Sequence, residues 1–171
     1  MTIINGKRLL ASAPLDPMLD HKARAHGVSH GLSECGYDIT IKQEIRFQRI
    51  NGRMGAHICD DGEWTFHPGR FVLASSRERF TMPTNLVGVV HDKSTWARQG
   101  LSVLNTVIES GWNGWLTLEL IYHADARLVI PAGAGIAQVL FHELAEAADY
   151  GPGKYQGQPN RPVAAVMEKG Q

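Results

Sequence analysis

Short apolar runs separated by turn signals about every ten residues limit most strongly how this chain can fold. The run at 37–47 alternates in character and is interrupted near Gln43 and Glu44, and Asn51-Gly52 follows as a turn signal. Further strands are predicted at 64–66, 71–74, 86–90, 115–122, 128–130 and 136–141. This spacing is typical of an all-β fold, either a barrel or a jelly-roll-like sandwich.

Helical signals are few. A helix is predicted to begin near Lys7, and a second one at Ser94, which we expect to act as its N-cap, with Gly100 as the stop. No linker or internal repeat divides the 171 residues, so we expect one domain over 1–171. From Ala148 onward Gly, Pro, Gln and Lys dominate, which predicts a mobile segment at 148–171.

Composition restricts the partners. Lys plus Arg and Asp plus Glu are both 17, so the net charge is zero, which argues against nucleic acid or an anionic membrane as a partner. The two cysteines cannot form a disulfide framework, the apolar runs are too short to span a bilayer, and no secretory signal is apparent. We therefore expect a soluble, cytoplasmic protein.

Two zinc motifs are incomplete. His142-Glu143 begins an H-E-x-x-H motif, but Glu146 stands where the second His would be. The zinc-deaminase signature needs a C-x-x-C pair, whereas Cys35 and Cys59 lie far apart. No zinc site is expected.

Three segments carry candidate chemistry, each with a plainer alternative. Lys93, Ser94, Thr95 and Arg98 gather cations and hydroxyls around one turn, which suits phosphate or is simply a capped surface helix. Glu109 lies in a turn, where it could hold a sugar hydroxyl or a water, or could be a solvated carboxylate.

The same turn holds Trp112, which could pack on a deoxyribose. Glu119 lies in the alternating strand at 115–122, where Thr117 and Glu119 share one face. A carboxyl group among apolar residues suits acid–base work, and the alternative is a Glu on the solvent face.

The order and spacing of seven segments make the sequence resemble the dCTP deaminase/dUTPase superfamily, and within it the dCTP deaminase branch. The segments are CGYD at 35–38, HPGRFVLAS at 67–75, MP at 82–83, STWARQGL at 94–101, IESGWNGWLTLEL at 108–120, GIAQVLF at 135–141 and YGPGKYQGQ at 150–158. The resemblance implies a homotrimer of distorted, dUTPase-like β-barrels, with active sites between subunits and Mg²⁺ carried by the nucleotide triphosphate.

The resemblance also implies residue roles. Glu119 matches the general base that activates water for attack on cytosine C4, and Ser94 and Arg98 match an essential hydroxyl and cation. The implied substrate-binding residues are Lys93, Thr95, Glu109, Trp112, Thr117, Gln138, Tyr150, Lys154, Tyr155 and Gln158. Of these, Tyr150, Lys154, Tyr155 and Gln158 belong to a C-terminal lid over the phosphates.

Some positions depart from the family pattern. Lys93 replaces the usual Arg, Glu109 replaces the usual Asp, and the stretch 100–112 has the shorter dUTPase length. The leading expectation is zinc-independent hydrolytic deamination of dCTP to dUTP, with onward hydrolysis to dUMP left open. The alternatives are a dUTP diphosphatase, which forms dUMP and pyrophosphate, and a weakly catalytic, nucleotide-binding regulatory trimer.

Overall fold

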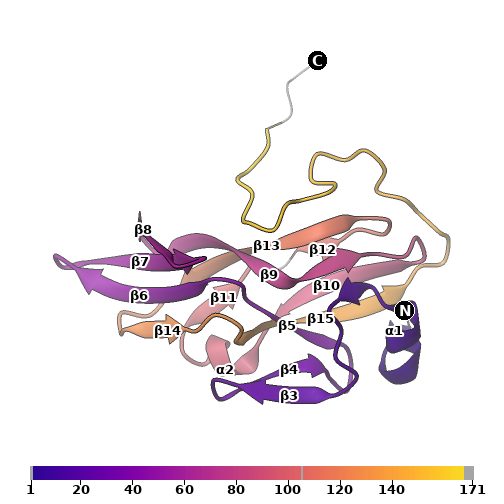
Figure 1. Cartoon of the computed structure of the whole chain (residues 1–171), viewed down its shortest axis with the longest axis horizontal. Helices are drawn as coiled ribbons and strands as arrows, with labels where there is room; N and C mark the ends of the chain where they lie inside the picture. Colours follow the sequence, from indigo (N-terminus) through magenta and orange to yellow (C-terminus); the bar gives the residue numbers. More distant parts are fainter. Residues whose placement is uncertain (1, 105, 168–171) are drawn as a thin grey trace.

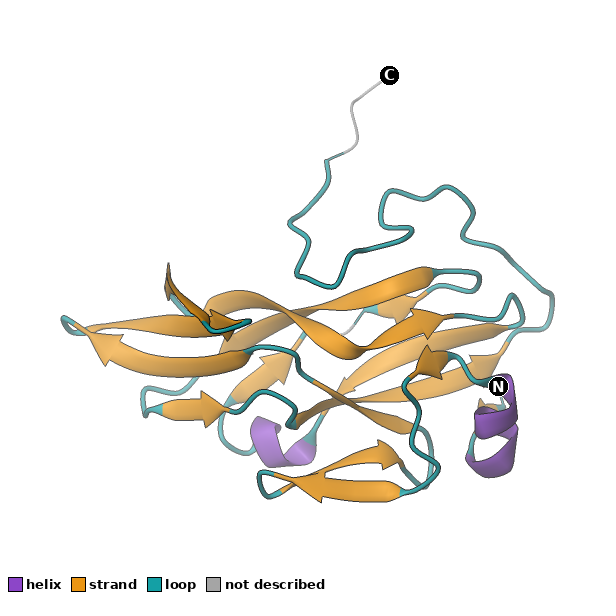
Figure 2. Ribbon diagram, in the orientation of Figure 1, coloured by secondary structure: helices purple, strands orange, loops and turns teal. Residues whose placement is uncertain are grey.

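The computed structural model describes residues 2–104 and 106–167, and in them the regular secondary structure consists mostly of β-strands (Figures 1 and 2). Three antiparallel sheets carry the fold. The largest has the order β12-β10-β15-β5-β4-β3, with β1 also paired to β15. Its strands are β12 (Val107–Ile108), β10 (Leu86–Asp92), β15 (Gly135–Glu143), β5 (Tyr37–Thr40), β4 (Val28–Leu32), β3 (Lys22–Ala25) and β1 (Ile3–Ile4).

Two four-stranded sheets complete the architecture. One has the order β11-β13-β9-β2, formed by β11 (Leu101–Val103), β13 (Asn113–Tyr122), β9 (Phe71–Thr81) and β2 (Leu15–Asp16). The other has the order β14-β6-β7-β8, formed by β14 (Leu128–Ile130), β6 (Glu44–Ile50), β7 (Arg53–Asp60) and β8 (Glu63–Pro68). The predicted all-β class is thereby confirmed.

The two short helices are α1 (Gly6–Ser12) and α2 (Ser94–Ala97). Both lie where the sequence predicts a helix, but the expected capping role of Ser94 is wrong. Lys93 occupies the N-cap position with an extended backbone and makes no side-chain capping bond, so Ser94 is the first helical residue. The hydroxyl of Ser94 therefore does not cap the helix.

Tight turns set the strand registers. In the β6–β7 turn, Asn51 and Gly52 both have positive φ, 51° and 79°, as a hairpin whose twist matches its strands requires. His26-Gly27 and Asp61-Gly62 form equivalent positive-φ turns that were not predicted from the sequence. Asn, Asp and His tolerate this conformation better than most residues, so these pairs are also readable signals.

An interruption is predicted near Gln43 and Glu44, and at 41–43 the chain leaves the sheet of β5 for that of β6, which begins at Glu44. Gln43 is only 1% exposed, and its side-chain amide accepts from Ser75 N at 2.8 Å and donates to Ser75 Oγ at 3.0 Å. A polar residue can be buried here because both ends of its amide are satisfied. The break thus links β5 to β9 and divides the predicted run into β5 and β6.

The core lies between the sheets and is built from alternating strand residues. In β13, Leu116, Leu118, Leu120 and Tyr122 are buried, and the residues between them are half-buried. The ring of Tyr122 packs 5.0 Å from that of Phe47, which joins β13 to β6. This two-faced pattern is the one predicted, and it fixes which side chains of β13 face away from the core.

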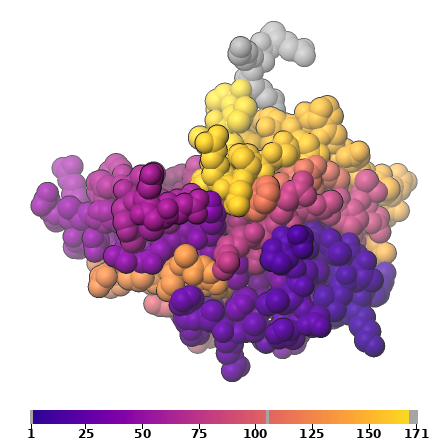
Figure 3. All heavy atoms as spheres, viewed as in Figure 1, coloured from indigo at the N-terminus to yellow at the C-terminus, as the bar shows by residue number. Residues whose placement is uncertain are grey.

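The chain after Glu143 crosses to the opposite edge of the molecule and lies over β13 (Figure 1). We call residues 148–167 the tail. In Figure 3 the yellow tail packs against the body beside the orange strand region, and backbone bonds from Ala148 N to Thr84 O and from Tyr150 N to Ser110 O fix its beginning.

Candidate active site

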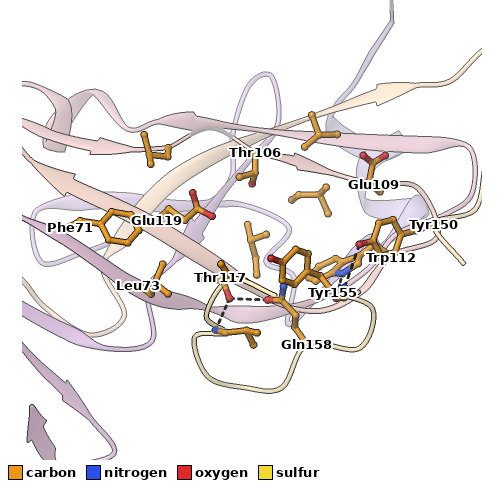
Figure 4. A pocket seen from close by; sticks show the side chains of 16 residues that line it. Phe71, Leu73, Thr106, Glu109, Trp112, Thr117, Glu119, Tyr150, Tyr155 and Gln158 are labelled. Carbon is orange, nitrogen blue, oxygen red and sulfur yellow. Dashed lines mark hydrogen bonds between the residues drawn. The ribbon is translucent and has the colours of Figure 1, made fainter. Parts of the chain in front are cut away.

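A cavity of about 410 Å³ lies between β13, β12, the start of β9 and the tail (Figure 4). Most of its lining is apolar. The lining residues are Phe71, Leu73, Leu104, Thr106, Val107, Ile108, Glu109, Trp112, Leu116, Thr117, Glu119, Tyr150, Tyr155, Gln158, Val163 and Ala165. Such a mixture, an apolar wall with a few convergent polar groups, is typical of a small-molecule site.

Glu119 provides the carboxyl group at one end of this cavity. It lies on the half-buried face of β13 and is paired across the sheet with Leu73 of β9. Figure 4 shows its carboxyl group in the cavity, with Phe71 to one side and Thr106 across from it. The alternative of a Glu that simply faces solvent is thus not what the structure shows. A carboxylate held here can exchange a proton with a bound water.

The other end of the cavity holds Glu109 and Trp112. Glu109 is exposed at the rim, while Trp112 is 5% exposed and packs against Phe80, with ring centroids 6.1 Å apart. The indole nitrogen of Trp112 donates to Tyr155 O at 2.6 Å. The turn that carries both residues therefore forms one wall and also supports the tail.

The tail closes the cavity through hydrogen bonds to β13. Thr117 Oγ1 donates to Gln158 Oε1 at 2.8 Å and accepts from Val163 N at 3.0 Å. Its hydroxyl is thus engaged by two separate points of the tail. Tyr155 is held by Trp112 on one side, and its amide approaches the hydroxyl of Tyr150 at 3.4 Å.

The predicted phosphate residues of α2 do not line this cavity. Ser94, Thr95 and Arg98 are exposed, and α2 lies on the opposite side of the molecule from the tail in Figure 1. Lys93 differs from them, because its ammonium forms a buried ion pair with Asp38 at 2.6 Å.

Two further predicted residues also lie away from the cavity. Gln138 is half-buried on β15 and donates to Ser33 Oγ at 2.9 Å. Lys154 is exposed, with its ammonium 5.3 Å from the ring centroid of Tyr155. Within one chain, the structure brings together Glu109, Trp112, Thr117, Glu119, Tyr150, Tyr155 and Gln158 and leaves the remaining predicted residues outside.

Comparison with known proteins identifies the family of the chain. The model of the dCTP deaminase-like family matches residues 16–144, which include β13 and the turn before it. The chain belongs to the dCTP deaminase-like family.

Relatives within this dCTP deaminase-like family share most of their length with the chain. A dCTP deaminase of Herpetosiphon aurantiacus is 36% identical, with 84% of this chain and 86% of the relative covered. A dCTP deaminase of Chlamydia muridarum is 34% identical, with 94% and 95% covered. The resemblance to the deaminase branch is thereby confirmed.

Among solved structures, a mutant dUTPase from phage phi11 of S. aureus superposes with a TM-score of 0.52 at 13% identity. The match covers 82% of this chain and 97% of the phage chain. That phage dUTPase coordinates a structural Mg(II) ion. The similarity confirms the dUTPase-like fold predicted for this dCTP deaminase-like protein.

Several cavity residues were not predicted from the sequence. Phe71 and Leu73 follow from the register, since β9 pairs Leu73 with Glu119 and Phe71 with Ile121. Alternation places both on the face of Glu119, so the strand pattern contained this signal. Val163 and Ala165 carry no comparable signal, because a Pro- and Gly-rich segment has no periodicity that fixes what it covers.

Metal-binding clusters and membrane-spanning helices are both absent from the described part of the chain. Within residues 2–104 and 106–167, no group of three or more His, Cys, Asp or Glu side chains is arranged to hold a metal ion. Over the same residues, no helix is long and apolar enough to cross a membrane.

Proposed function

We propose that this protein hydrolyses dCTP to dUTP and ammonia, with Glu119 as the general base. Membership of the dCTP deaminase-like family supports the reaction class, as do the relatives named dCTP deaminase. The observation that carries the assignment of the base is the position of Glu119. It places a carboxyl group in a largely apolar cavity large enough for a pyrimidine nucleoside.

The chemistry needs one proton acceptor near the pyrimidine ring. Glu119 takes one proton from water as the oxygen attacks C4 and passes it to N3, which receives the electron pair of the C4–N3 double bond, so that C4 becomes tetrahedral and bears a hydroxyl and the amino group. The same carboxylate then takes the hydroxyl proton and gives it to the amino nitrogen, so that the bond from C4 to that nitrogen breaks, ammonia leaves and the C4 carbonyl forms while N3 keeps its proton. Because each proton passes through one group, a single carboxyl suffices and no zinc ion is required.

The sugar and the base have separate supports in the proposed site. Glu109 and Trp112 lie at the far end of the cavity from Glu119, where a deoxyribose hydroxyl would meet the carboxylate and the sugar face would meet the indole (Figure 4). Tyr150, Tyr155 and Gln158 would cover the bound nucleotide from the tail. Thr117 serves the site indirectly, since its hydroxyl already holds Gln158 and Val163.

Among residues 2–104 and 106–167, no Lys or Arg side chain lines the cavity to bind a triphosphate, and a second copy would supply such cations. Ser94, Thr95 and Arg98 are exposed on α2, and Leu104, Val107 and Phe71 are exposed apolar residues beside the cavity. We propose a homotrimer in which α2 of one subunit meets the cavity of another. There Arg98, Ser94 and Gln138 would bind phosphate oxygens, and Lys154 would approach from the tail.

Mg²⁺ is proposed as part of the substrate rather than as a resident ion. Mg²⁺ favours phosphate oxygens and water with one or two carboxylates, and an exposed carboxylate, Glu109, lies at the cavity end proposed for the sugar, to which the triphosphate is attached. When bound, the ion would neutralise the charge of the triphosphate. The chain itself would contribute the carboxylate of Glu109 to the surroundings of the ion, together with the tail beside it.

One observation favours a second candidate, dUTP diphosphatase activity. Glu109 and Glu119 line the same cavity, so a second carboxylate is available to orient a water toward the phosphate chain. That reaction breaks the α–β phosphoanhydride bond, gives dUMP and pyrophosphate, and leaves the base unchanged. The dUTPase-like fold suits both reactions.

The deciding experiment incubates the protein with Mg²⁺ and either dCTP or dUTP and separates the products by chromatography, with ammonia measured in parallel. Release of ammonia and formation of dUTP from dCTP support the proposal. Pyrophosphate from dUTP without ammonia from dCTP would replace it with the diphosphatase. Binding of dCTP without turnover of either nucleotide would indicate the regulatory role instead.

A further inference from the structure

The tail is attached to the turn before β13 by one side chain that sequence reasoning did not single out. Gln156 Nε2 donates to Gly111 O at 3.0 Å, and Gln156 Oε1 accepts from Asn113 N at 2.8 Å. The neighbouring Gly157 N donates to Asn113 O at 2.9 Å. A glutamine amide has both a donor and an acceptor, which this pair of backbone groups requires. Gln156 therefore bridges Gly111 and Asn113, the two residues on either side of Trp112, in what we call the 111–113 turn.

Strand β13 is shaped to receive the tail directly after this clasp. Gly114 forms a parallel bridge with Gln158, and Trp115 N donates to Gln158 O at 3.2 Å. A Cβ atom at Gly114 would lie 2.6 Å from Gln158 N and 2.9 Å from Gln158 O. Glycine inside a strand often marks such a close backbone approach. Gly114, which has no side chain, therefore stands where the backbone of the tail crosses β13.

A second attachment follows two residues later. Lys42 Nζ donates to Asn160 O at 3.1 Å and also contacts the carboxylates of Asp60 and Asp61. Burial alone would lower the pKa of Lys42, but the two carboxylates outweigh this and raise it, so the ammonium is charged at neutral pH. Gln158 lies between the two attachments, and its side chain reaches Thr117 at the cavity.

We infer that Gln156 is a positioning residue: its clasp on the 111–113 turn sets the register in which Tyr155 and Gln158 cover the cavity. Gln156 itself does not line the cavity. Its effect on catalysis rests on the proposed function, because Tyr155 and Gln158 are proposed nucleotide contacts. The attachment of the tail is independent of that function and is tested separately.

The test compares Gln156→Ala and Gln156→Glu with the wild-type chain. Gln156→Glu keeps the size and the acceptor but replaces the donor to Gly111 O with an oxygen. Asn160→Ala is the matched control, because it removes an exposed amide from the same tail and retains the backbone oxygen that Lys42 holds. Trypsin reports attachment, since cleavage after Lys154 releases a peptide that begins at Tyr155, while Arg161 is protected by Pro162.

Both Gln156 variants should lose this peptide faster than wild type without nucleotide: about tenfold for Gln156→Ala, which loses two hydrogen bonds, and about fivefold for Gln156→Glu, which loses the bond to Gly111 O. The KM for dCTP should rise by a similar factor, with kcat within about twofold, and Asn160→Ala should match wild type in both. Equal cleavage rates in all four proteins would overturn the clasp, and faster cleavage with an unchanged KM would overturn its positioning role. If wild type releases no ammonia, the proposed function fails, yet the cleavage rates still decide the clasp.

Discussion

The ammonium of Lys93 lies 2.6 Å from Asp38 Oδ2, with the two side chains only 10% and 4% exposed. Ser29 Oγ also donates to this carboxylate oxygen, at 3.3 Å. Lys93 is the N-cap residue of α2, so the ion pair fixes the start of the helix that presents Ser94 and Arg98. Lys93, which the resemblance implies as a substrate-binding residue, thus directs its charge toward Asp38 inside the protein. Its role in binding phosphate stays a prediction.

Removal of the ammonium should destabilise the fold. Lys93→Met leaves the buried Asp38 carboxylate without its cation, which we expect to cost about 3 kcal/mol in the free energy of unfolding. Urea denaturation measures this loss. Asp38→Asn combined with Lys93→Met should recover part of it, because no charge then remains unpaired. If the stability lost in the double variant equals the sum of the losses measured for Lys93→Met and Asp38→Asn singly, the pair does not act as a unit.

Replacement of the proposed base should separate binding from chemistry. Glu119→Gln retains the shape of the side chain but cannot accept a proton from water, so ammonia release from dCTP should fall about 10²–10⁴-fold. Calorimetric titration should give a dissociation constant for dCTP close to that of wild type. Glu63→Gln, an exposed change on β8, is the control and should keep full activity. Full activity of Glu119→Gln would remove Glu119 from its proposed role.

Local patterns in the sequence were sufficient for much of this structure. Alternation in 115–122 correctly separated the two faces of β13, because successive side chains of a strand point to opposite sides. The break near Gln43 and the turn at Asn51-Gly52 were also readable, since consecutive polar residues interrupt the alternation and positive φ restricts the residue type. These are constraints that neighbouring residues impose on one another.

Long-range contacts could not be read in the same way. The partner of Lys93 is 55 residues away, and nothing near Asp38 in the sequence indicates that an ammonium will reach it. The tail was expected to be mobile because Gly, Pro, Gln and Lys dominate it, yet it is attached through Gln156, Gln158 and Lys42. Its mobility remains a prediction.

A buried carboxyl group on β9 should make stability depend on pH. Glu78 is 4% exposed and accepts hydrogen bonds from Thr40 N and Thr40 Oγ1. Burial raises the pKa of Glu78 above its ordinary value of 4.5, and the bonds from Thr40 oppose this only in part. Since the folded state holds the proton more tightly, Glu78 contributes less stability as the pH rises from about 4.5 through the raised pKa.

Glu78→Gln isolates that contribution. The free energy of unfolding of wild type minus that of Glu78→Gln should fall as the pH increases from about 4 to about 7, with a slope of at most about 1.4 kcal/mol per pH unit. Denaturation at a series of pH values measures both proteins. A difference that rises over this range would mean that the Thr40 bonds outweigh burial.

Deletion of the tail should weaken nucleotide binding without unfolding the protein. The tail contributes Tyr150, Tyr155 and Gln158 to the cavity, whereas the buried hydrophobic core belongs to residues before Ala148. A chain that ends at Ala147 and carries Glu119→Gln, so that dCTP is not consumed, should bind dCTP at least about tenfold more weakly than the full-length Glu119→Gln protein.

Light scattering should give the same oligomeric mass for both proteins, because the proposed trimer contacts lie around α2 and the cavity mouth. Unchanged affinity would refute the lid, and a lower mass would show instead that the tail holds the subunits together. The two results are distinguishable because affinity and mass are measured on the same samples.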